Sequence, residues 1–170
     1  MIELQDCADD SGASLRMHLP AEADTEALGA ALATCLRPGL HIWLHGHLGS
    51  GKTTLVRGLL RKCGFGGKVK SPTYTLIEPY AVSSLDFYHF DFYRFNSPEE
   101  YLDAGLDEYF GNAGVCVVEW PEKAFPFLPA ADLEVRIEAD GDGRSVAITG
   151  NSGAGRTCVI DLLTSLKSPT

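Results

Sequence analysis

The segment GHLGSGKTT, residues 46–54, carries residue types that can wrap a chain of phosphates. Its spacing fits G-x-x-x-x-G-K-[S/T], with Gly46, Gly51, Lys52 and Thr53 at the fixed positions. Glycines let successive backbone N–H groups turn toward phosphate oxygens, and a helix that begins at Lys52 adds the positive end of its dipole. A lysine ammonium suits the outer phosphates, and a threonine hydroxyl suits Mg2+. The segment therefore predicts a site for a nucleoside triphosphate with Mg2+.

The residues of this segment that are predicted to contact the nucleotide are consecutive: His47, Leu48, Gly49, Ser50, Gly51, Lys52 and Thr53. A GTPase would be expected to carry an N-K-x-D segment that grips guanine, and the sequence has none, which favours ATP. His45 and His47 flank Gly46, but no third ligand of matching position accompanies them. We therefore expect neither histidine to bind a metal.

Two acidic residues could hold a metal ion or activate the water that attacks a phosphate. Asp91 ends the run LDFYHFD and Glu119 ends the run VCVVE, so each follows a stretch that is typical of a buried strand. Carboxylates at strand ends next to a phosphate loop can hold Mg2+ or polarise an attacking water. The residues alone leave open which acid does which, and either could be only a solvated acid at a strand end. With Lys52, they form the predicted catalytic set.

The loop SPTYT, residues 71–75, has hydroxyl groups that could reach the γ-phosphate and act as a switch. Its candidates are Ser71, Thr73, Tyr74 and Thr75. The alternative is a plain turn, because Ser-Pro is common in turns. Trp120, which follows Glu119, would sense the metal site or simply fill the core, and its residue type favours the core.

The elements that must position these residues are indicated by periodicity. Strands are predicted in ASLRMHLP, LHIWLH, TYTLIEPY, LDFYHFDFY and VCVVEW, and helices in DTEALGAALATCL, capped by Asp24 or Thr25, and TTLVRGLLRKC. SPEEYLDAG begins a helix with Ser97 as its cap, DLEVRIEA and RSVAITG form a hairpin through DGDG, and TCVIDLLTSL is either helix or strand. We predict one domain over residues 1–170 with flexible ends. Its fold class is a three-layer α/β P-loop NTPase fold, with a mixed parallel and antiparallel sheet flanked by helices and with late antiparallel strands.

Composition narrows the class of protein. The chain of 170 residues is 45% hydrophobic and 22% charged, which is an ordinary globular balance. It has no signal-like start and no apolar run long enough for a membrane helix. Five cysteines without a C-x-x-C pair are expected to be reduced, with no disulfide partner. We predict a cytoplasmic protein.

Charge is unevenly distributed along the chain. The net charge of −9 argues against a protein that coats a nucleic acid by itself, yet residues 27–77 contain seven Lys and Arg and no acid. Arg57 and Arg61 lie four apart in the predicted helix after the loop, so they share one face that could contact a partner. The alternative is an ordinary solvated face.

Other P-loop proteins are small-molecule kinases or scaffolds without turnover. A kinase needs a lid with clustered arginines, whereas Arg94, Arg136, Arg144 and Arg156 do not cluster in the sequence. A scaffold that does not hydrolyse its nucleotide would not need two acids beside the loop. A protein that switches slowly by hydrolysis would also have them. Both remain alternatives.

Several motifs together resemble one family. GHLGSGKTT, KSPTYTLIEPY, YHFDFYRF, PEEYLDAGLDEYF and VVEWPEK occur in the order and close spacing of the TsaE (YjeE) family of P-loop ATPases, from about Leu19 to Ile148. The resemblance implies ATP-dependent work in the threonylcarbamoyladenosine modification of tRNA, with TsaD-like and TsaB-like partners. It implies that tRNA is reached through that complex, and that hydrolysis supports turnover of the complex.

The resemblance also assigns roles to residues. It implies phosphate contacts by Lys52, Thr53 and Thr54, magnesium ligation by Thr53 and Glu119, and catalysis by Asp91. It makes SPTYT a switch-like loop and Trp120 a functional neighbour of Glu119. Glu22 and Thr25 would line the adenine pocket, with Gly143 and Arg144 as further candidates. The sequence departs from the family's GDLGAGKT at His47, which replaces an Asp; this change would leave binding intact and could alter hydrolysis.

Overall fold

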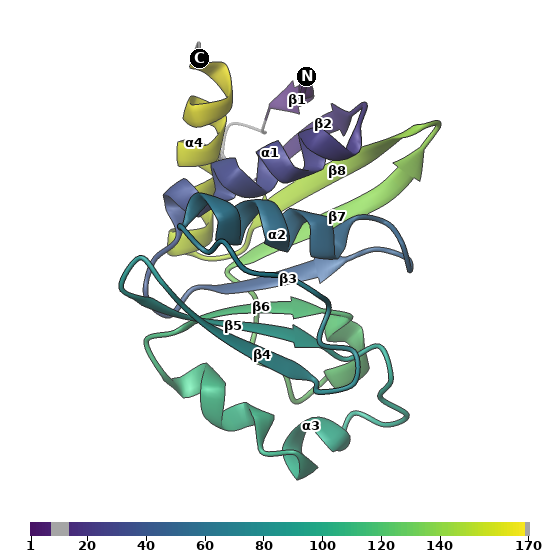
Figure 1. Ribbon diagram of the computed structural model, residues 1–170, viewed down its shortest axis with the longest axis vertical. Helices are drawn as coiled ribbons and strands as arrows, with labels where there is room; N and C mark the ends of the chain where they lie inside the picture. Colours follow the sequence, from purple (N-terminus) through teal and green to yellow (C-terminus); the bar gives the residue numbers. More distant parts are fainter. Residues whose placement is uncertain (8–13, 169–170) are drawn as a thin grey trace.

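The computed structural model describes residues 1–7 and 14–168, with the side chains of residues 6 and 7 outside the description (Figure 1). Its strands are β1 (Glu3–Cys7), β2 (Ser14–Leu19), β3 (His41–His45), β4 (Ile77–Val82), β5 (Leu85–Asp91), β6 (Val115–Glu119), β7 (Leu133–Asp140) and β8 (Gly143–Gly150). Its helices are α1 (Glu22–Leu32), α2 (Lys52–Lys62), α3 (Glu100–Asp103) and α4 (Gly153–Lys167), with 3-10 turns η1 (Ala33–Cys35), η2 (Leu106–Gly111) and η3 (Pro121–Ala124).

The strands form one sheet of mixed direction. Their order is β1-β2-β8-β7-β3-β6-β5-β4. β3 pairs in parallel with β6 and β7, and β5 pairs in parallel with β6, whereas the pairs at both sides of this centre are antiparallel. Parallel pairing puts the carboxyl ends of β3, β5 and β6 at one edge, which is where ligands bind in open α/β sheets. The predicted mixed sheet with late antiparallel strands is confirmed.

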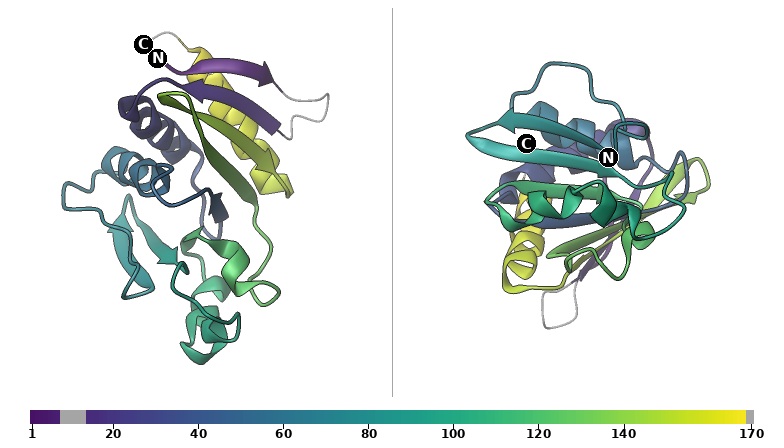
Figure 2. Two further views of the ribbon diagram at one scale, coloured as in Figure 1. Left: turned by 90° about the vertical axis from the view of Figure 1, so that its right-hand side faces the viewer. Right: turned by 90° about the horizontal axis from the view of Figure 1, so that it is seen from below.

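Helices cover the sheet unequally. On β5 and β6, neighbouring residues belong to different apolar clusters, such as Phe87 and Tyr88 or Val117 and Val118, because successive side chains point to opposite faces. One cluster packs under α1, α2 and α4, and the other lies under the short helical turns between β5 and β7. Figure 2 shows α1 and α2 side by side on one side of the sheet. The flanking helical layers agree with the predicted architecture.

Two glycines allow α1 and α2 to pack in close contact. A Cβ atom at Gly58 would lie 2.1 Å from the carbonyl oxygen of Glu26, and one at Gly29 would lie 2.1 Å from that of Leu55. Both distances are shorter than any tolerated contact, so no larger residue fits without moving a helix. This packing places the start of α1 beside the start of α2.

Several local predictions need correction. α1 begins at Glu22 rather than behind a cap at Asp24 or Thr25, and the Asp24 carboxylate instead accepts the Ala21 N–H from within the first turn. The helix predicted from Ser97 begins at Glu100, whose carboxylate accepts the Ser97 N–H. β4 starts at Ile77, later than the strand predicted from Thr73, because residues 71–76 turn toward the sheet edge. The last segment, which sequence left undecided, is the helix α4.

The prediction of five reduced cysteines is wrong for one pair. Cys35 and Cys158 are joined in a disulfide, with Cα atoms 5.1 Å apart and 123 residues of separation. Sequence spacing carries no signal for this pair, because only the packing of α4 against η1 brings the two residues together. Cys63 and Cys116 are free thiols, and burial raises the pKa of Cys116 to about 12.

No helix in residues 1–7 and 14–168 is long and apolar enough to cross a membrane. At the two ends, β1 begins at Glu3 and pairs with β2, and α4 continues to Lys167. Residues 169 and 170 lie outside the described part, and the flexibility of the ends stays a prediction.

Candidate functional site

The predicted phosphate loop runs from the end of β3 to the start of α2. Gly49 and Gly51 have φ angles of +77° and +111°, a backbone conformation that side-chain-bearing residues rarely adopt. A Cβ at Gly46 would lie 2.6 Å from the carbonyl oxygen of Ile137, so the loop also passes too close to β7 for a larger residue. These glycines allow the chain to turn back onto the N-terminus of α2, whose free N–H groups favour an anion.

Lys52 is directed back into this loop. Its Nζ donates to the carbonyl oxygens of Gly46 at 2.6 Å and His47 at 2.9 Å, and it lies 4.6 Å from the ring centroid of Trp120. Burial lowers the pKa of Lys52, while the charges of Glu119 and Asp91 oppose this shift. The ammonium therefore lies where a phosphate oxygen could replace the carbonyl oxygens.

Thr53 and Glu119 form a pair of oxygen donors at the sheet edge. The Thr53 hydroxyl lies 3.3 Å from both carboxylate oxygens of Glu119, which is 3% exposed. Below them, His89 Nε2 lies 2.7 Å from Glu119 Oε2. His89 is fully buried, and its Nδ1 has no hydrogen-bond partner in the described part of the chain. A hydroxyl and a carboxylate are ligands that Mg2+ prefers.

Asp91 lies on the other side of Ser71. The Ser71 hydroxyl donates to Asp91 Oδ2 in a short hydrogen bond and lies 3.3 Å from Glu119 Oε2. Thr73 Oγ1 lies 3.4 Å from the same Asp91 oxygen, and the Tyr93 N–H donates to Oδ1 at 2.9 Å. The Ser71–Thr73 segment therefore connects the two acids, which sit at the ends of adjacent parallel strands in register.

A cavity of about 220 Å³ joins these groups. Its lining combines the loop with both acids: Leu48, Gly49, Ser50, Gly51, Lys52, Thr53, Thr54, Ser71, Thr73, Asp91, Tyr93, Glu119 and Trp120. Trp120 has a left-handed backbone with φ +58°, and its ring lies 5.1 Å from that of Tyr93. Such a conformation costs about 1–3 kcal/mol in a residue other than glycine and is concentrated at functional sites.

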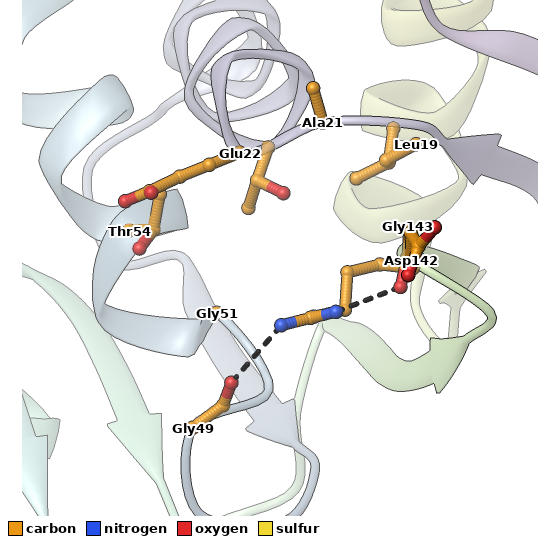
Figure 3. Close-up of a pocket in the computed structure, with 10 residues that line it drawn as sticks. Leu19, Ala21, Glu22, Gly49, Gly51, Thr54, Asp142 and Gly143 are labelled. Atoms are coloured by element: carbon orange, nitrogen blue, oxygen red, sulfur yellow. Dashed lines mark hydrogen bonds between the residues drawn. The ribbon is translucent and has the colours of Figure 1, made fainter.

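A second cavity of about 270 Å³ shares Gly49, Gly51 and Thr54 with the first (Figure 3). It is lined by Leu19, Ala21, Glu22, Thr25, Gly49, Gly51, Thr54, Asp142, Gly143 and Arg144. Arg144 connects its walls, because its Nε donates to the Ser50 carbonyl oxygen at 2.9 Å and its Nη1 to that of Gly143 at 2.8 Å. The β7–β8 hairpin is thereby fastened to the phosphate loop.

Some predicted residues lie outside both cavities. The His47 side chain is exposed, and Tyr74 and Thr75 line a different cavity. Arg57 Nη1 lies 3.6 Å from Glu26, and Arg61 donates to the carbonyl oxygen of Phe65 at 3.2 Å and to that of Gly67. Contact of these arginines with a partner stays a prediction.

Sequence reasoning missed His89 and Tyr93. His89 stands two residues before Asp91, so in a strand both side chains point to one face. That spacing is the sequence signal for His89. Tyr93, Ala21 and Asp142 also line the cavities, and no sequence pattern singles them out.

Comparisons with known proteins identify relatives over most of the chain. The family model described as "Threonylcarbamoyl adenosine biosynthesis protein TsaE" matches residues 19–146. A Haemophilus influenzae protein named tRNA threonylcarbamoyladenosine biosynthesis protein TsaE is 38% identical over 151 residues, which are 86% of this chain and 96% of that protein. The Bacillus subtilis protein of the same name is 40% identical over 119 residues, which are 70% of this chain and 74% of that protein.

The fold also has a solved counterpart. A crystal structure described as Bacillus subtilis YdiB superposes with a TM-score of 0.77 at 31% sequence identity. The superposition covers 89% of this chain and 95% of the other. The likeness therefore extends over most of the fold.

Proposed function

The chain belongs to the TsaE family of tRNA threonylcarbamoyladenosine biosynthesis proteins, and from this premise we propose that it binds ATP with Mg2+ and hydrolyses it in support of that tRNA modification. The observation that carries the proposal is the convergence of Lys52 and Thr53 with Asp91 and Glu119 in one cavity. The carboxyl ends of three parallel strands bring these four residues together.

Each of the two cavities would hold a different part of the nucleotide. The cavity of Asp91 and Glu119 would hold the outer phosphates, with Lys52 and the N–H groups of the loop as donors. The cavity of Glu22, Thr25 and Arg144 would hold the adenosine part, because it adjoins the first cavity along the same loop. Thr54 lines both cavities, which places it at the junction.

The residues present fit a magnesium ion. Thr53 and Glu119 offer oxygen donors within 3.3 Å of each other at the start of α2, and Mg2+ is commonly held by one or two such groups plus phosphates and water. When bound, the ion would neutralise charge on the phosphates. Asp91, held by Ser71 and the Tyr93 N–H, would accept a proton from the attacking water or orient it.

The partners of this activity are TsaD-like and TsaB-like proteins, and tRNA would be reached through their complex. The exposed Leu48 at the tip of the loop and Trp120 at the cavity mouth leave apolar surface beside the nucleotide, which suits a partner that responds to the bound state. His47 in place of the family's Asp lies outside both cavities, which is consistent with retained binding.

The first experiment measures phosphate release from γ-labelled ATP by the purified protein. We expect slow, Mg2+-dependent release that changes when a TsaB–TsaD complex is added. Glu119→Gln should abolish the Mg2+ dependence and reduce turnover, whereas Glu138→Gln, an exposed acid on β7, should do neither. Unchanged metal dependence in Glu119→Gln would show that Glu119 does not bind the metal.

The same assay separates the alternatives. A small-molecule kinase would transfer the label to an acceptor in a cell extract rather than release it as free phosphate. A scaffold without turnover would bind ATP and accumulate no ADP. Either result would contradict the proposed hydrolysis.

A further inference from the structure

The cations of the acid-free segment 27–77 are used in different ways. Arg37 pairs with Asp161 at 3.3 Å, Arg57 lies near Glu26, and Arg61 donates to backbone carbonyl oxygens. Lys52 belongs to the phosphate loop. Lys68 and Lys70 have no carboxylate within ion-pair distance in the described part of the chain, although the protein as a whole carries nine more acids than bases.

These two lysines line one cavity together with an exposed aromatic ring. The cavity has a volume of about 310 Å³ and also includes Tyr74, which is 82% exposed. The guanidinium of Arg94 lies over the Tyr74 ring at 4.1 Å, and it too is without a carboxylate partner among the described residues. One face of the ring is therefore covered by a cation, and the side chain otherwise faces solvent.

We propose that Lys68, Lys70 and the Tyr74–Arg94 stack form a contact surface for an unpaired segment of RNA. The lysines would neutralise phosphodiesters, and a base would stack on the open face of Tyr74. The inference deepens the proposed function in tRNA modification and rests on it for the class of nucleic acid.

An RNA strand fits this surface better than an acidic protein segment. Both would pair with the lysines, but only a nucleic acid offers flat bases to a ring that already has a cation on one face. Glu78 lines the same cavity, so the surface is not uniformly basic. A small patch of three cations fits a short segment of RNA rather than a long duplex, which agrees with the net charge of −9.

This surface is connected to the proposed nucleotide site by one short segment. Ser71 lines both cavities and hydrogen-bonds to Asp91, and it directly follows Lys70. RNA held at Lys70 would therefore contact the segment that orients Asp91. The state of the nucleotide and the binding of RNA should influence each other.

The test measures fluorescence anisotropy of a fluorescein-labelled, unmodified tRNA transcript mixed with the full chain over a series of salt concentrations. Lys68→Ala/Lys70→Ala should weaken binding about tenfold and lower the slope of log K against log salt by roughly 1.4, which is two lost phosphate contacts. Tyr74→Ala should weaken binding about tenfold with an unchanged slope, because it removes stacking and no charge. Ultraviolet crosslinking should join RNA to a peptide that contains Tyr74.

The matched control is Arg156→Ala/Lys167→Ala, which removes two exposed cations from α4. The inference is overturned if this control weakens tRNA binding as much as Lys68→Ala/Lys70→Ala, or if neither does. It is also overturned if the lysine variant keeps its tRNA affinity but fails to bind a TsaB–TsaD complex, since the surface would then contact protein.

Binding of a fluorescent ATP analogue is measured on every variant. A wild-type chain that binds the analogue but not tRNA would contradict this inference alone. A wild-type chain that does not bind the analogue would contradict the proposed function, whatever it does with tRNA. Folding of each variant is checked by its thermal unfolding.

Discussion

His89 supports Glu119 from beneath the sheet edge, with its Nε2 2.7 Å from Glu119 Oε2. A carboxylate oxygen accepts hydrogen bonds, so this contact suits an Nε2–H donor on His89, whose Nδ1 has no partner in the described part of the chain. The remaining contacts of Glu119, from Thr53 and Ser71, are longer at 3.3 Å. His89 is thus the group that fixes the orientation of this carboxylate.

Replacing His89 should weaken metal binding more than it weakens folding. His89→Leu removes the donor, and we expect about a 10–100-fold loss in apparent Mg2+ affinity, as for other groups that orient a metal ligand. His89→Gln keeps an N–H donor and should restore part of it. The Mg2+ affinity of both variants is measured by titrating Mg2+ into the protein with a non-hydrolysable ATP analogue and following Trp120 fluorescence. Equal Mg2+ affinity in the wild type and His89→Leu would contradict a positioning role.

Arg144 should determine nucleotide affinity through the loop that it holds. Its guanidinium contacts the Ser50 and Gly143 carbonyl oxygens at once, which a lysine ammonium cannot match with the same planar geometry. Arg144→Lys should therefore weaken binding of a fluorescent ATP analogue about tenfold, and Arg144→Ala by at least as much. Arg136→Lys, at an exposed position on β7, is the control and should bind as the wild type does. If Arg144→Ala bound the ATP analogue as the wild type does, the β7–β8 hairpin would not contribute to nucleotide binding.

Gly58→Ala should destabilise the protein although alanine favours helices. The added methyl group would lie 2.1 Å from the Glu26 carbonyl oxygen, and overpacking of this kind costs about 1–3 kcal/mol in the free energy of unfolding. Urea unfolding of this variant is compared with that of Gly66→Ala, where nothing lies within 4 Å of the added group. Similar midpoints for the two variants would mean that α1 and α2 can separate freely.

The pKa of Glu134 leads to a pH-dependent prediction. Burial opposes ionisation of Glu134, but hydrogen bonds from Asn151 at 2.8 Å and His45 at 2.9 Å outweigh it and lower its pKa. A carboxyl with a lowered pKa in the folded state adds stability above its unfolded pKa of about 4.3, and this stability is lost as pH falls through the folded pKa.

Glu134→Gln should therefore be less stable than the wild type at pH 7, and the difference should shrink below about pH 4. Urea unfolding midpoints at both pH values test this. Glu138→Gln, an exposed acid on the same face of β7, should show little effect at either. A stability difference that grows as pH falls would reverse the assigned sign.

The disulfide predicts a thiol count. Cys35 and Cys158 are joined, so protein denatured without reductant should titrate at least two thiols fewer than the five cysteines of the chain. Prior reduction should raise the count to five and lower the unfolding free energy, typically by about 2–4 kcal/mol, because the bridge restrains the unfolded chain. A count of five without reductant would contradict the Cys35–Cys158 bond.

The sequence by itself determined the glycine-rich loop of residues 46–54, the alternation of strands and helices, and both acids at strand ends. These features are local, since glycine spacing, apolar periodicity and an acid after an apolar run are all written in consecutive residues. The resemblance added Glu22, Thr25 and Arg144 as site residues, a role that local patterns did not indicate. The course of the last helix stayed undecided, because its short apolar run suits either a buried strand or a helix.

Only the tertiary structure decided which distant residues meet. Strand pairing set Asp91 beside Glu119, the close packing of α1 on α2 put Glu22 next to Thr54, and the packing of α4 joined Cys35 to Cys158. The tertiary structure also decided which basic side chains form ion pairs. Arg57 lies near Glu26, whereas Lys68 and Lys70 have no carboxylate within ion-pair distance among the described residues. Contacts of this kind depend on the strand order and register of the whole sheet, which no single stretch of sequence encodes.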